Sequence, residues 1–315
     1  MADYVIGIDA GGTHTDAAAY ALPEPSGTVW AAPEPIVTTA SGCGNLALDP
    51  ESAADSIVSA ASEVVRLMRE RGFGVCRRIL CGAAGSTSAV EGVSAAEFCR
   101  KRLLPLCEAV SVVSDGEMAL IAAFGKTGDG LLVVSGTGSI VYLRKDGKLT
   151  RAGGWGHLLG DGGSGFSVAQ TALKRLLSGV DSGSPDVELE EAVFRFLGIR
   201  SYPELISFVY GKPKSALAAL APTIENLAEA GNSEALDALR QSAGELAEDA
   251  LRLLGRIDKK QSSLPLCLSG GCFEHLPLLR RFFLERLEEA SPVPLSVTPT
   301  PPPTAAVLRL TDCQL

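Results

Sequence analysis

Two short apolar runs, each followed by a turn rich in glycine and threonine and then by a second apolar run, most constrain the fold of this chain. Residues 5–22 contain the first copy of this pattern, and residues 131–143 contain the second. Each copy predicts a strand, a glycine turn and a returning strand. The two copies could be ordinary hairpins, but the glycine and threonine that both turns share favour a duplication. We therefore expect two similar halves.

Helix-capping signals mark two helices between these hairpins. Asp49 is suited to cap a helix whose first residue is Pro50, and Gly72 is suited to end that helix. Ser94 and Glu97 form a capping box at the start of a second helix. Helices that alternate with strand-like runs indicate an α/β protein.

The length and the downstream pattern predict two domains. A chain of 315 residues is long enough for two cores. Residues 186–257 are dominated by Ala, Leu and Glu and predict an almost wholly helical segment. We expect an N-terminal domain over residues 1–114 and a larger C-terminal domain with a helical insertion over residues 115–298. Residues 299–315 then form a terminal segment that packs back on the first domain.

The charge balance disfavours some classes of partner. The net charge is −9 and the sequence contains no basic cluster, whereas a nucleic-acid interface needs a positive face. Any phosphate site in this chain must therefore be neutralised mainly by backbone N–H groups and a metal ion. No apolar stretch is long enough to cross a bilayer, and the first residues lack the positive leader of a signal peptide, so we expect a cytoplasmic protein.

The eight cysteines contain no C-x-x-C pair, and most of them lie in apolar runs. This pattern favours reduced, buried thiols over a disulfide framework or a zinc site. A cluster assembled from cysteines distant in the sequence is the alternative.

Both glycine turns carry side chains suited to phosphate chemistry. Asp9 stands at the end of the first strand and could hold a water molecule on Mg²⁺. Glycines in both turns allow the backbone to approach a phosphate closely, and a threonine adds a hydroxyl. Taken singly, each turn could be a plain turn, but together they favour a clamp on a polyphosphate. These turn residues are Gly11, Gly12 and Thr13 in the first turn and Gly136, Thr137 and Gly138 in the second.

Asp115 follows a predicted strand directly and precedes a predicted helix. Ligands of α/β sheets gather at the carboxyl ends of strands, so Asp115 is a candidate general base for an attacking hydroxyl. It could equally cap the helix that follows. The residues alone do not separate these two interpretations.

The loop over residues 153–161 places a tryptophan and a histidine among glycines. Such a loop suggests an ordered binding segment, in which Trp155 could stack on a sugar face and Asp161 could accept hydrogen bonds from hydroxyls. A structural role for the tryptophan is the alternative.

Two familiar nucleotide-binding motifs match only part of their patterns. Residues 125–127 lack the earlier glycine of a P-loop, and residues 160–165 lack the strand that precedes a dinucleotide-binding turn.

Together these motifs resemble the N-acetylglucosamine kinases of the BadF/BadG/BcrA/BcrD ATPase family, within the superfamily of actin, sugar kinases and heat-shock ATPases. Residues 7–13 and 134–139 are similar to the two phosphate motifs, and residues 268–271 are similar to the adenosine motif. Residues 153–161 resemble the kinase branch most specifically. The resemblance implies duplicated actin-like (ribonuclease H-like) ATPase domains with a cleft between them. The chain departs from the family pattern at Ala10 and His14, where glycine and lysine are common.

The resemblance also implies roles for individual residues. Asp115 would be the catalytic base, and Thr13 and Thr137 would contact the phosphates of ATP. The remaining nucleotide contacts would come from Ala218, Gly270 and Gly271. The sugar would be held by Asn45, Ser139, Gly154, Trp155, Gly156 and Asp161.

We therefore expect an enzyme that uses Mg-ATP to phosphorylate the primary hydroxyl of a small amino sugar, most simply N-acetylglucosamine, and that forms a homodimer as relatives of this family commonly do. Glucosamine, N-acetylmuramate or glucose are alternative acceptors. An ATPase that activates a radical dehydratase or reductase is a second hypothesis, but no cysteine lies between Cys107 and Cys267, near the second phosphate turn. A sugar sensor that binds DNA is a third, and the net charge disfavours it.

Overall fold

The computed structural model describes residues 1–22, 32–90, 92–258 and 263–310. The chain forms two compact units. Unit 1 comprises Met1–Gly128 together with Thr300–Leu315, and unit 2 comprises Asp129–Pro299. The domain boundary predicted from the sequence lies earlier, at Asp115. The units divide later because the helix that begins at Asp115 packs on the sheet of unit 1.

Unit 1 is built on a five-stranded sheet with the strand order β3-β2-β1-β4-β7. The hairpin of β1 and β2 and the neighbouring β3 are antiparallel, whereas β4 and β7 run parallel to β1. The strands are β1 (Tyr4–Ala10), β2 (Thr15–Ala21), β3 (Val37–Ser41), β4 (Cys76–Ala83) and β7 (Ala109–Val113); a separate short pair is formed by β5 (Ala89–Val90) and β6 (Val93–Ser94).

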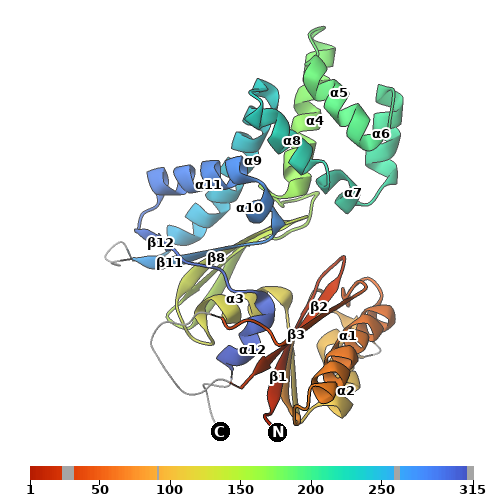
Figure 1. The fold of residues 1–315 in the computed structure, drawn as a ribbon. Helices are drawn as coiled ribbons and strands as arrows, with labels where there is room; N and C mark the ends of the chain where they lie inside the picture. Colours follow the sequence, from red (N-terminus) through yellow and green to blue (C-terminus); the bar gives the residue numbers. More distant parts are fainter. Residues whose placement is uncertain (23–31, 91, 259–262, 311–315) are drawn as a thin grey trace. The chain divides into compact units, whose positions relative to one another are not determined.

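Helices cover both faces of this sheet (Figure 1). Alternate residues of β1 enter opposite cores: Ile6 and Ile8 pack with α1 and α2, whereas Val5 packs with α3 and the C-terminal segment. Because β1 is buried on both sides, its sequence is a continuous apolar run. The helical elements are α1 (Pro50–Glu70), α2 (Ala95–Leu103), η1 (Leu104–Leu106), α3 (Asp115–Phe124), η2 (Pro303–Ala305) and α12 (Ala306–Arg309).

The capping signals of the sequence account for the starts of α1 and α2. Asp49 accepts a hydrogen bond from the N–H of Ser52, and Pro50 is the first residue of α1, as predicted. Ser94 accepts from the N–H of Glu97, which confirms half of the predicted capping box. The other half is wrong, because the Glu97 carboxylate pairs with Arg100 one turn later.

Unit 2 repeats the same sheet. Its strand order is β10-β9-β8-β11-β12, with an antiparallel hairpin of β8 and β9, an antiparallel β10, and parallel β11 and β12. The two sheets therefore share one topology, which confirms the duplication predicted from the hairpins. The strands are β8 (Gly130–Ser135), β9 (Ser139–Lys145), β10 (Lys148–Gly153), β11 (Leu264–Ser269) and β12 (Leu295–Val297).

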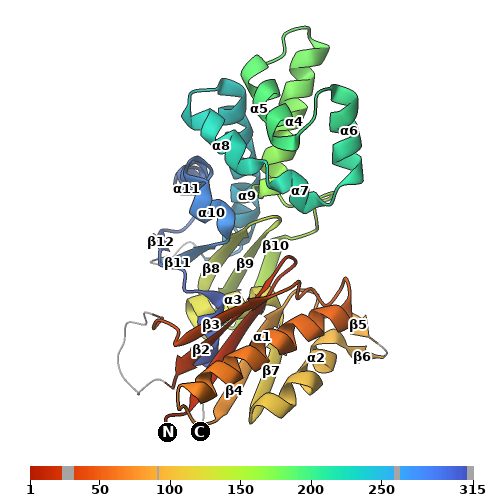
Figure 2. The same cartoon turned by 45° about the vertical axis from the view of Figure 1, so that its right-hand side comes forward.

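The rest of unit 2 is mainly helical, as the composition of residues 186–257 predicted (Figure 2). The central helix α9 packs against α4, α8 and α11 in one apolar core with the strands of the sheet. The helices are α4 (Gly165–Asp181), α5 (Val187–Leu197), α6 (Tyr202–Gly211), α7 (Lys214–Ala218), α8 (Ala221–Glu229), α9 (Ser233–Leu254), α10 (Gly271–His275) and α11 (Pro277–Ala290).

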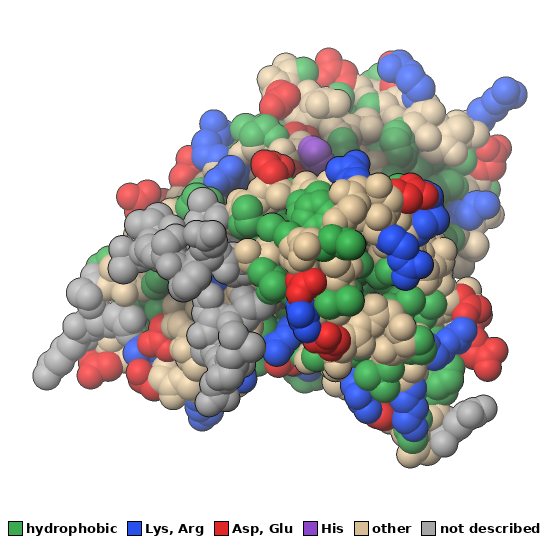
Figure 3. Space-filling view, turned by 60° about the horizontal axis from the view of Figure 1, so that its bottom comes forward, with side chains coloured by type: hydrophobic (Ala, Val, Ile, Leu, Met, Phe, Trp, Pro, Cys, Tyr) green, Lys and Arg blue, Asp and Glu red, His purple; other side chains and the backbone are tan. Residues whose placement is uncertain are grey.

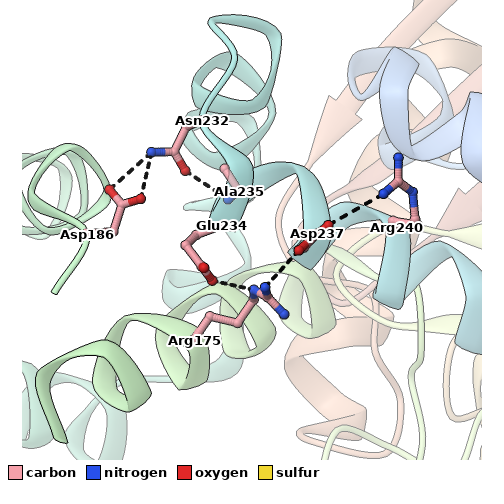
Figure 4. A network of polar contacts seen from close by, with 7 residues as sticks. All are labelled: Arg175, Asp186, Asn232, Glu234, Ala235, Asp237 and Arg240. Atoms are coloured by element: carbon pink, nitrogen blue, oxygen red, sulfur yellow. Dashed lines mark hydrogen bonds and ion pairs between the residues drawn. The ribbon is translucent and has the colours of Figure 1, made fainter. Parts of the chain in front are cut away.

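Polar contacts fix the start of α9 to its neighbours (Figure 4). The Asn232 amide oxygen accepts a hydrogen bond from the N–H of Ala235, while the amide nitrogen donates to both carboxylate oxygens of Asp186. Arg175 of α4 reaches Glu234 at 2.7 Å and Asp237 at 2.9 Å. The Asn232 side chain therefore satisfies the start of α9 and also ties it to Asp186, the N-cap of α5.

The described surface mixes charges of both signs. On the face drawn in Figure 3, Lys and Arg side chains alternate with Asp and Glu side chains. Among the described residues, none of the helices is both long and apolar enough to cross a membrane. The seven described cysteines are free thiols, and Cys313 lies outside the described residues.

Candidate functional site

The first glycine turn, between β1 and β2, presents its backbone to solvent. It is closed by a hydrogen bond from the Gly11 N–H to the His14 carbonyl at 3.0 Å. Gly12 and Thr13 are exposed, and a Cβ added to Gly12 would meet nothing within 4 Å. Because the Gly11 amide is already bonded, the exposed backbone of Gly12 and Thr13 is the part of this turn that could contact a phosphate. The His14 ring lies between the Thr13 hydroxyl, at 2.9 Å, and Asp16, at 3.0 Å.

The segment that carries Asn45 lies directly behind this turn. The Gly44 N–H donates to the Gly11 carbonyl at 3.0 Å, and a side chain on Gly44 would collide with Thr15 and with Ala10. The Asn45 amide oxygen accepts a hydrogen bond from the N–H of Ala47 at 2.9 Å. The glycine of this segment therefore permits the close approach that brings Asn45 to the first turn.

The parallel strands of unit 1 bring Asp9 and Asp115 to one edge of the sheet. Asp9 on β1 pairs in register with Gly82 on β4, and Gly82 pairs with Val113 on β7, two residues before Asp115. Burial, together with the nearby carboxylates of Asp115 and Asp16, raises the pKa of Asp9 to about 6. The carboxyl edge of the first sheet thus carries an excess of negative charge.

Asp115 occupies the first turn of α3 but does not provide its N-cap. Ser114 is the N-cap, and its hydroxyl oxygen accepts a hydrogen bond from the N–H of Glu117 at 3.1 Å. Asp115 is exposed, and its Oδ1 accepts from the N–H of Gly116 at 2.8 Å. The helix reaches this position because Met118 packs directly over Gly82, where a Cβ would stand 2.5 Å from the Met118 side chain.

The donor set of unit 1 is compatible with Mg²⁺ bound together with a nucleotide. No cluster of three His, Cys, Asp or Glu side chains suited to hold a metal exists among the described residues. Mg²⁺ usually keeps several waters and takes only one or two carboxylates besides the phosphates. Burial is the main cause of the raised pKa of Asp9, and the carboxylates of Asp115 and Asp16 add negative charge beside it. A divalent ion would supply compensating positive charge.

The second glycine turn, between β8 and β9, lies at the start of a long helix. The Gly136 N–H donates to the Gly138 carbonyl at 2.9 Å, and the Gly136 carbonyl accepts from the N–H of Gly165 at 2.8 Å. Gly165 is the first residue of α4, whose N-cap is Ser164. A turn of glycines beside a helix N-terminus is suited to bind an anion.

The predicted adenosine motif lies against the same turn. Gly270 follows β11, and the parallel pairing of β11 with β8 brings it to Ser135. Its φ is +100°, and a Cβ there would stand 2.3 Å from the Ser135 carbonyl oxygen. The Cys272 thiol donates to the Gly136 carbonyl at 3.2 Å. Sequence reasoning missed Cys272, although its position two residues after Gly270 could have indicated it.

Asp161 and Ala218 also gather at the second turn. The Asp161 carboxylate accepts a hydrogen bond from the Ser139 N–H at 3.4 Å and lies 3.3 Å from the ammonium of Lys214. The Ala218 carbonyl lies against Gly165. Lys214 was not predicted, because it stands 53 residues from Asp161 in an insertion whose sequence signals only helix.

The loop around Trp155 projects from the end of β10. Trp155 is 63% exposed, and the Arg151 guanidinium lies 4.3 Å from the centre of its ring. Gly154 has a φ of +67° and lies against Ile140, where a larger residue would collide. Trp155 is therefore not a buried structural plug, and one face of its ring is supported by a cation.

Each unit thus assembles one group of the predicted residues. Unit 1 brings together Asp9, the first turn, Asn45 and Asp115. Unit 2 gathers the second turn with Ser139, Asp161, Ala218, Gly270 and Gly271, and carries Gly154, Trp155 and Gly156 on the loop that leads to Asp161. The roles of these residues stay predictions.

Solved structures share this fold. A protein from Chromobacterium violaceum that is proposed to be an N-acetylglucosamine kinase superposes with a TM-score of 0.74 at 24% identity, and the match covers 98% of both chains. A ROK family glucokinase from Streptomyces griseus, in complex with glucose and AMPPNP, matches with a TM-score of 0.58 at 17% identity over 98% of both chains. The fold is therefore that of the actin-like sugar kinases, as predicted.

Curated relatives carry kinase names. The N-acetylmuramic acid/N-acetylglucosamine kinase of Clostridium acetobutylicum is 30% identical over 207 residues, which are 65% of this chain and 67% of that protein. The N-acetyl-D-glucosamine kinase of Dictyostelium discoideum is 29% identical over 210 residues, 64% of this chain and 65% of that protein. The matched segments thus span about two thirds of these relatives.

A family model matches residues 6–307, which include both glycine turns and the loop that carries Trp155. This confirms the prediction of an ATP-using enzyme, and it agrees with the kinase names of the curated relatives. The chain belongs to the BadF/BadG/BcrA/BcrD ATPase family.

Proposed function

We propose that this chain is a kinase that transfers the γ-phosphoryl group of ATP to the primary (6-) hydroxyl of an amino sugar, with N-acetylglucosamine as the acceptor. The observation that carries the proposal is Asp115, an exposed carboxylate beside Asp9 at the carboxyl edge of the first sheet, with its helix capped by another residue. The names of the two curated relatives support the choice of acceptor.

In this proposal Asp115 is the general base. Its Oδ1 accepts the N–H of Gly116, so Oδ2 is available to take the proton of the attacking hydroxyl. The oxygen of that hydroxyl then attacks the γ-phosphorus in line with the departing ADP oxygen. No covalent enzyme intermediate is needed, so the contribution of the protein is positioning and charge stabilisation.

The phosphates of ATP are contacted by the backbone amides and the threonine hydroxyls of the two turns, including Thr13 and Thr137. Mg²⁺ bound with ATP would supply positive charge to the phosphate oxygens, and Asp9 would hold it through a water molecule. The N-terminus of α4 favours negative charge beside the second turn. Gly270, Gly271 and Ala218 complete the nucleotide contacts.

In this proposal the sugar stacks on the exposed ring of Trp155, which offers a flat apolar face. The amide of Asn45 has its oxygen bonded to Ala47, so its nitrogen is oriented as a donor. The remaining sugar contacts in the proposal are Ser139, Gly154, Gly156 and Asp161.

An ADP-release assay over a panel of sugars tests this proposal. N-acetylglucosamine is expected to give the highest kcat/KM, and N-acetylmuramate is included because one relative is named for both sugars. Glucosamine and glucose test the need for the acetamido group. Turnover with none of the four, in protein that binds ATP, would rule out the kinase proposal. The position of the new phosphate is checked by ³¹P–¹H correlation in the product.

The rival hypothesis is an ATPase that activates a radical dehydratase or reductase. Such a protein would carry an iron–sulfur cluster, so iron and acid-labile sulfide in anaerobically purified protein would favour it over the kinase.

We also propose a homodimer, which analytical ultracentrifugation tests. A cytoplasmic location of the protein is also part of the proposal, because the phosphate donor is ATP. Cell fractionation tests this location.

A further inference from the structure

The short helix α7 contacts, at each of its ends, a residue that adjoins the second turn. At its first residue, the ammonium of Lys214 lies 3.3 Å from Oδ2 of Asp161. At its last residue, the Ala218 carbonyl lies against Gly165, where an added Cβ would stand 3.1 Å from that oxygen. The Gly165 N–H donates in turn to the Gly136 carbonyl. Figures 1 and 2 show α7 at the end of the helical insertion that lies nearest the start of α4.

Asp161 places a negative charge directly against this turn. Its side chain is only 5% exposed, and a Cβ added to Gly138 would stand 2.9 Å from Oδ2. Its φ is +63°, in the left-handed region that residues other than glycine rarely adopt. The carboxylate is therefore held at the turn by its surroundings, including the Ser139 N–H, rather than by local backbone preference.

A carboxylate at this position opposes the binding of phosphate. Like charges repel more strongly where the protein excludes water, because the screening there is weaker. Among the described side chains, Lys214 is the basic group within ion-pair distance of Asp161. An ammonium has three donors, so one can bond Asp161 while the others face solvent or a ligand.

We propose that Lys214 is a positioning residue for the nucleotide. Acting through Asp161, it cancels the buried negative charge beside the second turn and so raises the affinity of that turn for the phosphates of ATP. The inference rests on the proposed function, since it assumes that the second turn binds nucleotide. It assigns to the helical insertion an indirect part in nucleotide affinity, exerted through Asp161.

The test compares Lys214→Met, which removes the charge at similar length, with Lys214→Arg, which keeps it. Lys212→Met is the matched control, because Lys212 is exposed and lies two residues away. The affinity for a non-hydrolysable ATP analogue is measured by calorimetry without sugar. Lys214→Met is expected to weaken binding about tenfold, whereas Lys214→Arg and Lys212→Met stay within about twofold of the parent. Where turnover is measured, the KM for ATP is expected to rise; the calorimetry is done without sugar because Asp161 is also a proposed sugar contact.

A double variant separates charge from shape. If Lys214 acts by neutralising Asp161, then Asp161→Asn combined with Lys214→Met should bind the analogue more tightly than Lys214→Met alone. Equal affinity of Lys214→Met and the parent overturns the inference, as does a rise confined to the KM for sugar. Lys214→Gln replaces Lys214→Met in the same comparison if the latter does not fold.

These measurements distinguish failure of the inference from failure of the proposed kinase. A protein that binds nucleotide but phosphorylates none of the sugars defeats the kinase proposal, while the calorimetric series still decides the role of Lys214. A protein that binds no nucleotide defeats both.

Discussion

The Ser114 hydroxyl oxygen accepts a hydrogen bond from the backbone N–H of Glu117 at 3.1 Å. This bond satisfies one of the orphan donors in the first turn of α3 and takes the N-cap role that the sequence left equally open to Asp115. Asp115 is left exposed one residue further on, at the carboxyl edge of a parallel strand. Ser114 therefore fills the N-cap position, and Asp115 contributes to the helix start only through its bond to the N–H of Gly116.

Asp115→Asn is predicted to lower kcat by about 10²- to 10⁴-fold, because a neutral amide cannot accept the proton of the attacking hydroxyl. The affinity for ATP and the melting temperature are expected to stay near those of the parent, since an asparagine can still accept the N–H of Gly116. Steady-state kinetics and nucleotide calorimetry check this. Glu117→Gln removes an exposed carboxylate from the same helical turn and should keep full activity. Equal kcat in Asp115→Asn and Glu117→Gln would contradict the base assignment.

Asp9 is predicted to destabilise the metal-free protein at neutral pH. Its pKa is raised to about 6 in the folded chain from an ordinary 3.8. Between these values the folded state binds a proton that the unfolded state has lost, so this group makes stability fall as pH rises from about 4 to about 6. Above about pH 6 Asp9 is ionised in both states, and the free-energy cost of burying its charge remains constant.

Asp9→Asn should therefore melt a few degrees higher than the parent at pH 7.5 in EDTA, a shift of the size expected for about 1–2 kcal/mol. The difference should shrink as pH falls toward 4, because Asp9 is then protonated in the folded state and increasingly protonated in the unfolded state. Differential scanning calorimetry at the two pH values measures it. Lower stability of Asp9→Asn than of the parent at pH 7.5 would contradict this prediction, because it would mean that the folded protein already stabilises the charged form of Asp9. The same variant should lose activity at limiting Mg²⁺.

Local signals in the sequence predicted much of the fold. The caps at Asp49 and Ser94 and the two glycine hairpins depend on a few neighbouring residues, and the structure confirms them. The Glu97 half of the capping box failed because an arginine three residues later offered a charged partner. Local patterns thus predict elements well, but competing partners decide individual contacts.

Contacts between distant segments could not be predicted. The boundary at Asp115 came from the end of a strand, and nothing local indicated that the next helix packs over Gly82. The pairing of Lys214 with Asp161 joins an insertion to a loop, and neither segment carries a pattern for the other. Such contacts depend on tertiary packing, which a single sequence does not display.

Gly7→Ala is predicted to destabilise unit 1 by at least about 3 kcal/mol, because a Cβ would lie 1.7 Å from the Thr304 carbonyl oxygen. Glycine in a buried strand often marks such a close backbone approach. Here it allows residues 300–310 to pack on β1 and on the neighbouring β2, whose Tyr20 hydroxyl lies 2.7 Å from that of Thr304. Chemical denaturation measures the loss. Gly12→Ala is the control, since its Cβ would meet nothing within 4 Å. Equal stability of the two variants would contradict the docking of the C-terminal segment.

Trp155→Ala is predicted to raise the KM for sugar about tenfold while the KM for ATP stays within about twofold, because loss of a stacking face costs on the order of 1–2 kcal/mol. The ring is largely exposed, so the melting temperature should hardly change. Leu158→Ala is the matched control: Leu158 is an exposed apolar residue of the same loop, and it has no proposed sugar contact. Trp155→Phe keeps an aromatic face and should recover part of the affinity. A rise in the KM for ATP, or an equal effect of Trp155→Ala and Leu158→Ala, would mean that the loop acts on nucleotide binding or through its general shape, and that the tryptophan does not bind the acceptor.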